Sequence, residues 1–182
     1  MGINKKRRRY LLLFILVIVF ISVAGLAKIV PVYPAFQKQV HSKEQIGKRF
    51  NDCKEVIIPQ IEMPGKENTV YFLNLDGRTL LSRPIGYLIS ATSNNEGQLA
   101  MYVLNCTIKQ EDIQGDVIQY KNFPIQINRI RNNCTLKFSI GNHLYTIDAF
   151  YNANSIDNNE SYNELFSDSI AIVHNIIDQY TE

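Results

Sequence analysis

A run of 17 uncharged and mostly apolar residues near the N-terminus, Leu11 to Ala27, constrains this chain more than any other feature. At about 1.5 Å per residue, a helix over residues 10–30 is roughly 30 Å long, which matches the hydrocarbon thickness of a bilayer. Pro31 and Pro34 follow, and proline does not continue a helix. We therefore predict a single-pass transmembrane signal-anchor helix over residues 10–30.

Five consecutive basic residues, Lys5 to Arg9, precede this run. Because positively charged loops stay on the cytoplasmic side, residues 1–9 are expected to form a cytoplasmic tail at the plasma membrane, with the remaining chain outside. A cleaved signal peptide is the alternative. Gly25-Leu26-Ala27 is a candidate cleavage site, and cleavage after Ala27 yields a secreted domain. The run exceeds the usual apolar region of about 7–15 residues, which favours the anchor.

Charge is unevenly distributed along the chain. The formal net charge is +2, but the first 30 residues contain six basic and no acidic side chains. The remaining residues carry 13 basic and 17 acidic side chains, so the part expected outside the membrane is mildly acidic. A nucleic-acid-binding domain presents a basic face, and the sequence predicts no nucleic-acid partner.

Beyond residue 43 the pattern is that of an antiparallel sheet. Short segments with alternating apolar and polar residues extend from Val56 to Tyr151, and turn signals such as Asp76-Gly77 and Gly141-Asn142 separate them. We expect about six to eight strands joined as hairpins, beginning with a strand at Val56–Ile58. Residues 31–42 are expected to be a linker to this domain.

Two helices are expected in the same domain, which spans residues 43–182. Ser42 and Gln45 have the spacing of a capping box, which predicts a short helix over about 43–52. From Tyr162 to Tyr180, apolar residues recur at three- and four-residue steps, which predicts an amphipathic helix after a second capping box at Ser161. The fold class is thus α+β, with the C-terminal helix packed on one face of the sheet.

The three cysteines, Cys53, Cys106 and Cys134, leave several arrangements open. Alternation turns Cys106 and Cys134 toward the core, and a location outside the cytoplasm permits a disulfide. A Cys106–Cys134 disulfide is one expectation. A bond that uses Cys53 and three free thiols are the alternatives, because an odd number leaves at least one cysteine unpaired within the chain.

No catalytic, cofactor-binding or metal-binding site is predicted. His41, His143 and His174 have no metal-binding spacing, and no cysteine pair has the spacing of a zinc site. A Gly-x-Ser-x-Gly elbow is absent from the sequence, and residues 157–160 lack the ligand spacing of an EF-hand. The sequence favours a protein that is not an enzyme.

The layout from Val56-Ile-Ile-Pro59 through the hairpins to Leu144-Tyr-Thr-Ile-Asp148 and the final helix resembles a known kind of module. It is similar to small extracytoplasmic β-rich domains of low-GC Gram-positive bacteria, including those at the C-termini of membrane-bound anti-sigma factors. The resemblance covers about residues 50–180 and depends on pattern. Anti-sigma factors need a cytoplasmic domain that holds the sigma factor, and nine residues precede the apolar run here, so that activity is not implied.

The sequence therefore predicts a membrane-anchored extracytoplasmic domain of the bacterial cell envelope that binds a partner. Expected partners are the membrane itself and another envelope protein or a peptide. One alternative is an envelope hydrolase. Another is an accessory subunit of a membrane complex that acts through the anchor helix.

Overall fold

The computed structural model describes residues 10, 14–18, 36–63, 68–78, 82–95, 98–108, 116–152 and 159–182, without the side chains of 93–95, 98, 99, 152 and 159–162. The chain divides into two compact units, residues 1–32 and 33–182. In the first unit, Tyr10 and residues 14–18 are helical, and the rest of the predicted anchor lies outside the described residues. Within the described ranges, no helix combines the length and apolar character that crossing a membrane requires.

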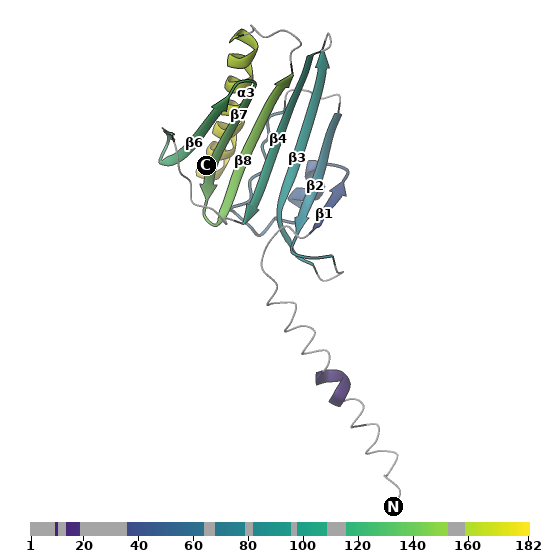
Figure 1. The fold of residues 1–182 in the computed structure, drawn as a ribbon. Coiled ribbons are helices and arrows are strands. Elements are labelled where there is room, and N and C mark those ends of the chain that lie inside the picture. The colour runs from purple at the N-terminus through teal and green to yellow at the C-terminus, as the bar shows by residue number, and fades with distance from the viewer. Residues whose placement is uncertain are drawn as a thin grey trace, which may run out of the picture. The chain divides into compact units, whose positions relative to one another are not determined.

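The second unit is built on one antiparallel sheet of eight strands, in the order β1-β2-β3-β4-β8-β7-β6-β5 (Figure 1). The strands are β1 (Phe36–Val40), β2 (Asn68–Leu75), β3 (Pro84–Asn95), β4 (Gln98–Ile108), β5 (Val117–Tyr120), β6 (Phe123–Ile130), β7 (Asn133–Ile140) and β8 (His143–Asn152). This arrangement confirms the α+β class and the expected number of strands. Because β8 pairs with both β4 and β7, the last strand of the chain lies near the centre of the sheet.

Tight turns join the strands from β5 to β8. Lys121, Arg131 and Gly141 each begin a two-residue turn and have φ of 48°, 48° and 54°, respectively. Positive φ in the turn matches the right-handed twist of the paired strands, which is why such turns suit hairpins. The predicted hairpin around Gly141-Asn142 is confirmed. Strands β3 and β4 also pair as an antiparallel hairpin.

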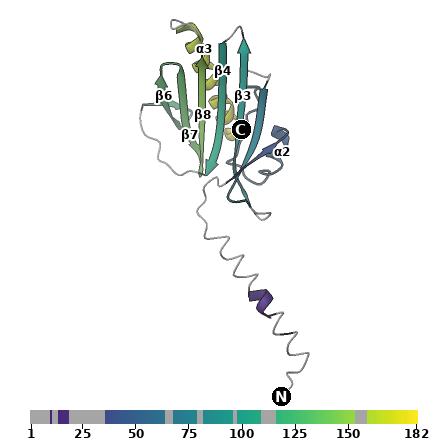
Figure 2. The same cartoon turned by 45° about the vertical axis from the view of Figure 1, so that its right-hand side comes forward.

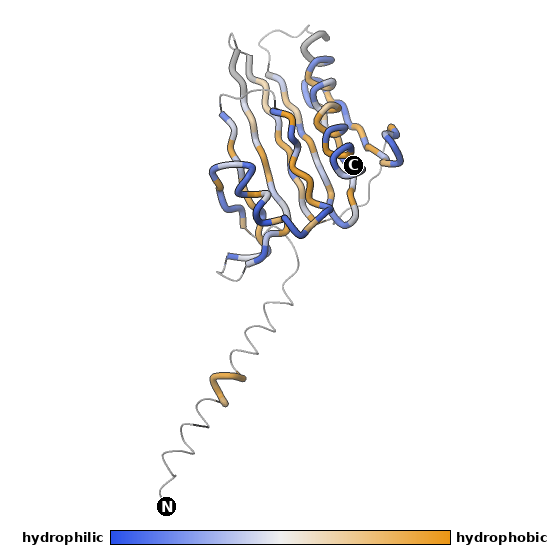
Figure 3. Tube along the Cα trace, turned by 180° about the vertical axis from the view of Figure 1, so that it is seen from behind, coloured by the Kyte–Doolittle hydropathy of each residue, from blue (hydrophilic) through white to orange (hydrophobic). Residues whose placement is uncertain are grey.

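Two helices and an irregular segment cover one face of the sheet. The helices are α2 (Lys43–Gly47) and α3 (Asn159–Thr181), and the irregular segment extends from residue 48 to 63. Figure 2 shows α3 behind the sheet, and Figure 3, seen from behind, shows α3 and the 41–63 segment in front of it. The predicted C-terminal helix is confirmed, but it begins at Asn159, so Ser161 lies inside the helix and does not cap it.

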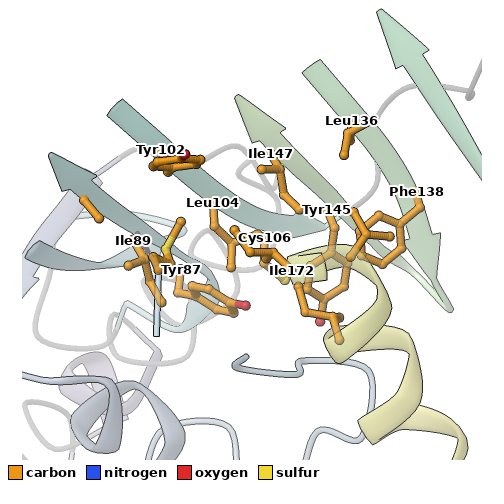
Figure 4. Packing of buried hydrophobic residues seen from close by; sticks show 14 of the residues in the cluster. Tyr87, Ile89, Tyr102, Leu104, Cys106, Leu136, Phe138, Tyr145, Ile147 and Ile172 are labelled. Atoms are coloured by element: carbon orange, nitrogen blue, oxygen red, sulfur yellow. The ribbon is translucent and has the colours of Figure 1, made fainter. Parts of the chain in front are cut away.

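The hydrophobic core lies between this layer and the sheet. Tyr87, Cys106 and Tyr145 come from the neighbouring strands β3, β4 and β8 and point to the same side, toward α3 (Figure 4). From α3, the residues Leu165, Ile172, Val173, Ile176 and Ile177 are buried against them. Along each of these strands, the apolar residues of the alternating pattern thus lie on the face that α3 covers.

Residues 56–58 belong to no strand, contrary to the strand predicted at Val56–Ile58, and Glu55 lies in the turn before them. Tyrosine hydroxyls from the sheet satisfy their backbone groups instead. Tyr145 Oη accepts a hydrogen bond from the Ile57 N–H at 2.6 Å and donates one to the Glu55 carbonyl at 2.7 Å. Tyr87 Oη donates to the Ile57 carbonyl. The segment therefore packs across the sheet and does not extend it.

Three further boundaries differ from the sequence prediction. The expected linker over residues 31–42 contains β1, which pairs with β2, and the expected helix over 43–52 ends at Gly47. Asp76-Gly77 does not form a two-residue turn, since Leu75 pairs with Pro84 across a longer connection. The Asp76 carboxylate accepts a hydrogen bond from the Arg83 N–H at 2.7 Å, which closes that connection.

Candidate functional site

The other face of the sheet carries the strongest candidate surface. Both α2 and α3 lie on the covered face, so alternate residues of the strands are left on an open face (Figure 1). One row of directly opposed residues crosses this face from β1 to β5: Gln39, Phe72, Leu88, Asn105, Thr146, Lys137, Gln126 and Val117. Along the row, the side chains change from apolar on β2 and β3 to polar on β4 through β6.

A polar trough occupies the second half of the open face. Its volume is about 480 Å³, and it lies over β4, β8, β7 and β6. Amide and hydroxyl side chains make up most of its lining: Asn105, Thr107, Gln126, Asn128, Thr135 and Thr146. Lys137 and Asp148 are its two charged residues, and Thr135 Oγ1 donates a hydrogen bond to Asp148 Oδ1 at 2.7 Å.

An apolar band occupies the first half of the same face. Val70 is 37% exposed, and Phe72, Leu88 and Val103 are half-buried at neighbouring positions on β2, β3 and β4. Large apolar side chains that stay accessible side by side mark interaction sites on soluble surfaces. The open face therefore combines an apolar half with a half that is rich in hydrogen-bonding groups.

A chain of side-chain amides crosses the open face near its β1 edge. Gln37 Nε2 donates to Asn74 Oδ1 at 3.2 Å, and Asn74 Nδ2 donates to Asn105 Oδ1 at 3.0 Å. Gly86 lies between Asn74 and β4, and a Cβ atom there would sit 1.8 Å from the Cys106 carbonyl oxygen. Only glycine allows this approach, so Gly86 lets the fully buried Asn74 side chain reach over β3.

The structure does not form the predicted Cys106–Cys134 disulfide. All three cysteines are free, and β8 lies between the two strands that carry Cys106 and Cys134. Cys106 faces Tyr145 and Cys134 faces Ala149, so the two differ in position both across and along the sheet. Two strand spacings alone amount to about 9.6 Å, beyond the roughly 7 Å between Cα atoms that a disulfide tolerates.

The two thiols on the sheet are shielded from solvent by the core. Burial raises the pKa of the Cys134 thiol to about 11 and raises the pKa of Cys106 further. Cys53 is partly exposed in the segment after α2. A thiol with a raised pKa is a poor nucleophile at neutral pH, so Cys106 and Cys134 act as core side chains.

The three histidines lie in separate places. His143 is buried beside Glu55, whose carboxylate is 3.2 Å from Nδ1, while His41 is exposed just before α2. His174 on α3 stacks on Tyr120, with 3.6 Å between ring centroids, and burial lowers its pKa. Within the described ranges, no serine is hydrogen-bonded to a histidine, and no three His, Cys, Asp or Glu side chains form a metal-binding group.

Within the Asp157–Glu160 stretch, where the sequence lacks the ligand spacing of a calcium loop, Asp157 and Asn158 lie outside the described residues, and Asn159 and Glu160 begin α3. The open face was not predicted from the sequence, although the alternation of apolar and polar residues along the strands shows which side chains point away from the core. In β4, for example, the residues that alternate with the buried Tyr102, Leu104 and Cys106 are Val103 and Asn105. What the sequence lacked was the strand order, which brings the polar halves of β4, β8, β7 and β6 together.

Comparison with protein families, with curated proteins and with solved structures found no match to this chain. The residues of the open face are therefore the basis for the function proposed below. Its amides, hydroxyls and apolar side chains can bind a chain-like ligand.

Proposed function

We propose that this protein is a membrane-anchored interaction domain that holds a polypeptide partner, an envelope protein or a peptide, on the open face of its sheet. One observation carries the proposal: a single accessible face joins the apolar band of Val70, Phe72, Leu88 and Val103 to the polar trough. A polypeptide offers both apolar side chains and backbone hydrogen-bonding groups, which is the mixture found in protein interfaces.

The location in the proposal comes from the N-terminal sequence. The uncharged run over Leu11 to Ala27 and the basic residues before it favour a signal anchor with residues 33–182 outside the cytoplasm. The resemblance to extracytoplasmic domains of low-GC Gram-positive bacteria supports the same location. In this proposal the anchor keeps the open face in the cell envelope, near its partner.

The location is tested on the mature protein. We expect the chain to stay in the membrane fraction after an alkaline carbonate wash and to keep residues 1–27. N-terminal sequencing that finds Lys28 as the first residue would instead show cleavage after Ala27 and a secreted domain.

The binding face is tested by site-specific photo-crosslinking in the producing cells. A photoreactive amino acid at Val103, on the open face, is expected to give one discrete crosslinked product, which mass spectrometry then identifies. The matched control carries the same amino acid at Ala171, which is exposed on α3. The expected product is absent from that control, because Ala171 does not lie on the open face.

A second variant links the crosslink to the polar half. Replacing Thr146 in the trough with lysine, in the Val103 reporter chain, adds bulk and charge to the trough and is expected to reduce the product at least several-fold. Circular dichroism of the purified variant checks that the fold is intact. Equal products at Val103 and Ala171, or a product that Thr146→Lys leaves unchanged, would overturn the proposal.

A further inference from the structure

Four basic side chains gather at the β1 edge of the domain, although residues 31–182 are acidic as a whole. They are Lys38 on β1, Lys48 and Arg49 after α2, and Arg78 in the connection between β2 and β3. All four are exposed. We call this group the basic rim.

Two adjoining hollows bring the basic rim together. One has a volume of about 540 Å³ and is lined by Lys38, Lys48 and Arg49 among others, and the other has a volume of about 400 Å³ and is lined by Lys38, Arg49 and Arg78. Both hollows share Lys38, Arg49 and the buried Leu73. No acidic residue lines either hollow among the described parts of the chain.

The rim charges are largely uncompensated. Within the described ranges, neither Lys38 nor Arg49 forms an ion pair, while Glu44 lies close enough to Lys48 to interact with it electrostatically. Arg78 packs over the ring of Phe36, 5.6 Å from its centroid, and that ring is 38% exposed. An exposed ring with a cation over it suits a membrane interface, where aromatic and basic side chains collect.

The proposed anchor would leave only a short connection between the membrane and the start of β1. Phe36 begins β1, and only five residues separate it from Val30 at the end of the predicted anchor. A chain of that length spans at most about 20 Å. An anionic lipid surface is therefore within reach of Phe36 and the adjoining rim residues.

We propose that the basic rim binds the anionic headgroups of the membrane in which the protein is anchored, and so holds the domain against the bilayer surface. Clustered positive charges supply the attraction, since each Lys or Arg near an anionic surface contributes binding energy within a Debye length. This inference depends on the proposed anchor.

The test uses the full chain reconstituted in vesicles. The protein has no tryptophan, so Phe36→Trp places a single fluorescent reporter in the rim. On vesicles that contain phosphatidylglycerol, we expect blue-shifted emission that headgroup-level quenchers reduce. On phosphatidylcholine alone, and at high salt with phosphatidylglycerol, we expect emission typical of a solvent-exposed ring.

Two double variants of the reporter chain test the rim itself. Lys38→Gln with Arg49→Gln is expected to lower the ratio of surface-bound to free domain about thirtyfold. The control, Lys54→Gln with Arg131→Gln, also removes one Lys and one Arg, but from exposed positions outside both hollows. This control is expected to leave the blue shift in place.

The outcomes separate this inference from the proposed anchor. A chain that fails to float with either kind of vesicle contradicts the anchor. A chain that floats with both but emits identically on both overturns the lipid contact alone. Soluble polyphosphate added to the phosphatidylcholine vesicles gives a third comparison. If it produces the same blue shift as phosphatidylglycerol does, the rim binds free polyanions, and the lipid assignment is overturned.

Discussion

Tyr145 binds a segment far away in the sequence through a single hydroxyl group, which serves two backbone groups of that segment. The hydroxyl donates to the Glu55 carbonyl and accepts from the Ile57 N–H, and the Tyr145 side chain is fully buried. In Tyr145→Phe both hydrogen bonds are lost, so we expect unfolding to become easier by about 2 kcal/mol. Tyr71→Phe is the matched control, because no hydrogen bond of its hydroxyl is seen among the described residues.

Denaturant unfolding of the full chain in detergent measures both variants. The Tyr71→Phe change is expected to stay within about 0.5 kcal/mol of the parent. Equal losses in the two variants would mean that the hydroxyl of Tyr145 contributes nothing specific, and that residues 55–57 are held by packing alone.

The hydrogen bonds to the Glu55 carboxylate are expected to make the stability of the fold depend on pH. Hydrogen bonds from the Asn142 N–H, and then from the His143 side chain, lower the pKa of Glu55 below its ordinary value of 4.5. A lowered pKa in the folded state stabilises the protein above pH 4.5, and this contribution is lost as the pH falls through the folded-state value. We expect the unfolding temperature to drop between about pH 5 and pH 3.

The variant Glu55→Gln cannot ionise, so its unfolding temperature is expected to fall less over the same pH range. Glu164→Gln, at an exposed position on α3, serves as the control and is expected to keep the full drop. Thermal melts followed by circular dichroism at several pH values give the comparison. A drop that is identical in Glu55→Gln and the parent would contradict the assignment.

The pairing of β3 with β4 depends on one glycine. In Gly86→Ala, the new Cβ would lie 1.8 Å from the Cys106 carbonyl oxygen, so backbone must move and the Asn74 side chain loses its path to Asn105. We expect a loss of about 3 kcal/mol in unfolding free energy. Gly47→Ala is the matched control, since its Cβ meets only Ile58 Cδ1 at 3.6 Å.

Gly47 ends α2, where alanine is the better helix former, so its substitution is expected to be neutral or to stabilise by up to about 1 kcal/mol. Urea unfolding of both variants checks the difference. A Gly86→Ala chain as stable as the parent would mean that β3 and β4 separate there without cost.

How far the sequence predicts each strand depends on the range of the interactions that form it. The turn at Gly141-Asn142 could be predicted because a two-residue turn is specified by its own residues. Asp76-Gly77 has the same signal, but β2 and β3 are joined by a longer connection, which is closed by a hydrogen bond from the Arg83 N–H to the Asp76 carboxylate. The strand predicted at Val56–Ile58 does not form, because the Ile57 backbone groups bond to the hydroxyl groups of Tyr87 and Tyr145, which are far away in the sequence.

The open face required information that single segments lack. Alternation shows that Asn105 and Thr146 point away from the core, but not that they are direct neighbours. That neighbourhood arises because β8 inserts between β4 and β7. The same insertion separates Cys106 from Cys134, which is why two core-facing cysteines led to a wrong disulfide prediction.

The whole domain therefore folds without covalent crosslinks, and thiol chemistry tests this. A thiol reagent added to the native chain near pH 8 is expected to modify only Cys53, because Cys106 and Cys134 are buried and their pKa values are raised. All three thiols react after unfolding, and reduction leaves the mass of the chain unchanged. Peptide mapping that finds Cys106 or Cys134 modified as fast as Cys53 would contradict the buried core.

The central position of β8 also affects how the protein is made. As the chain emerges during synthesis, β4 is complete well before β8 exists, so one edge of β4 has no partner until residues 143–152 arrive. An unpaired edge is a template for aggregation, and pairing between distant segments is slow to form. The half-made domain is thus expected to need protection from a chaperone until its last strand arrives and closes the sheet.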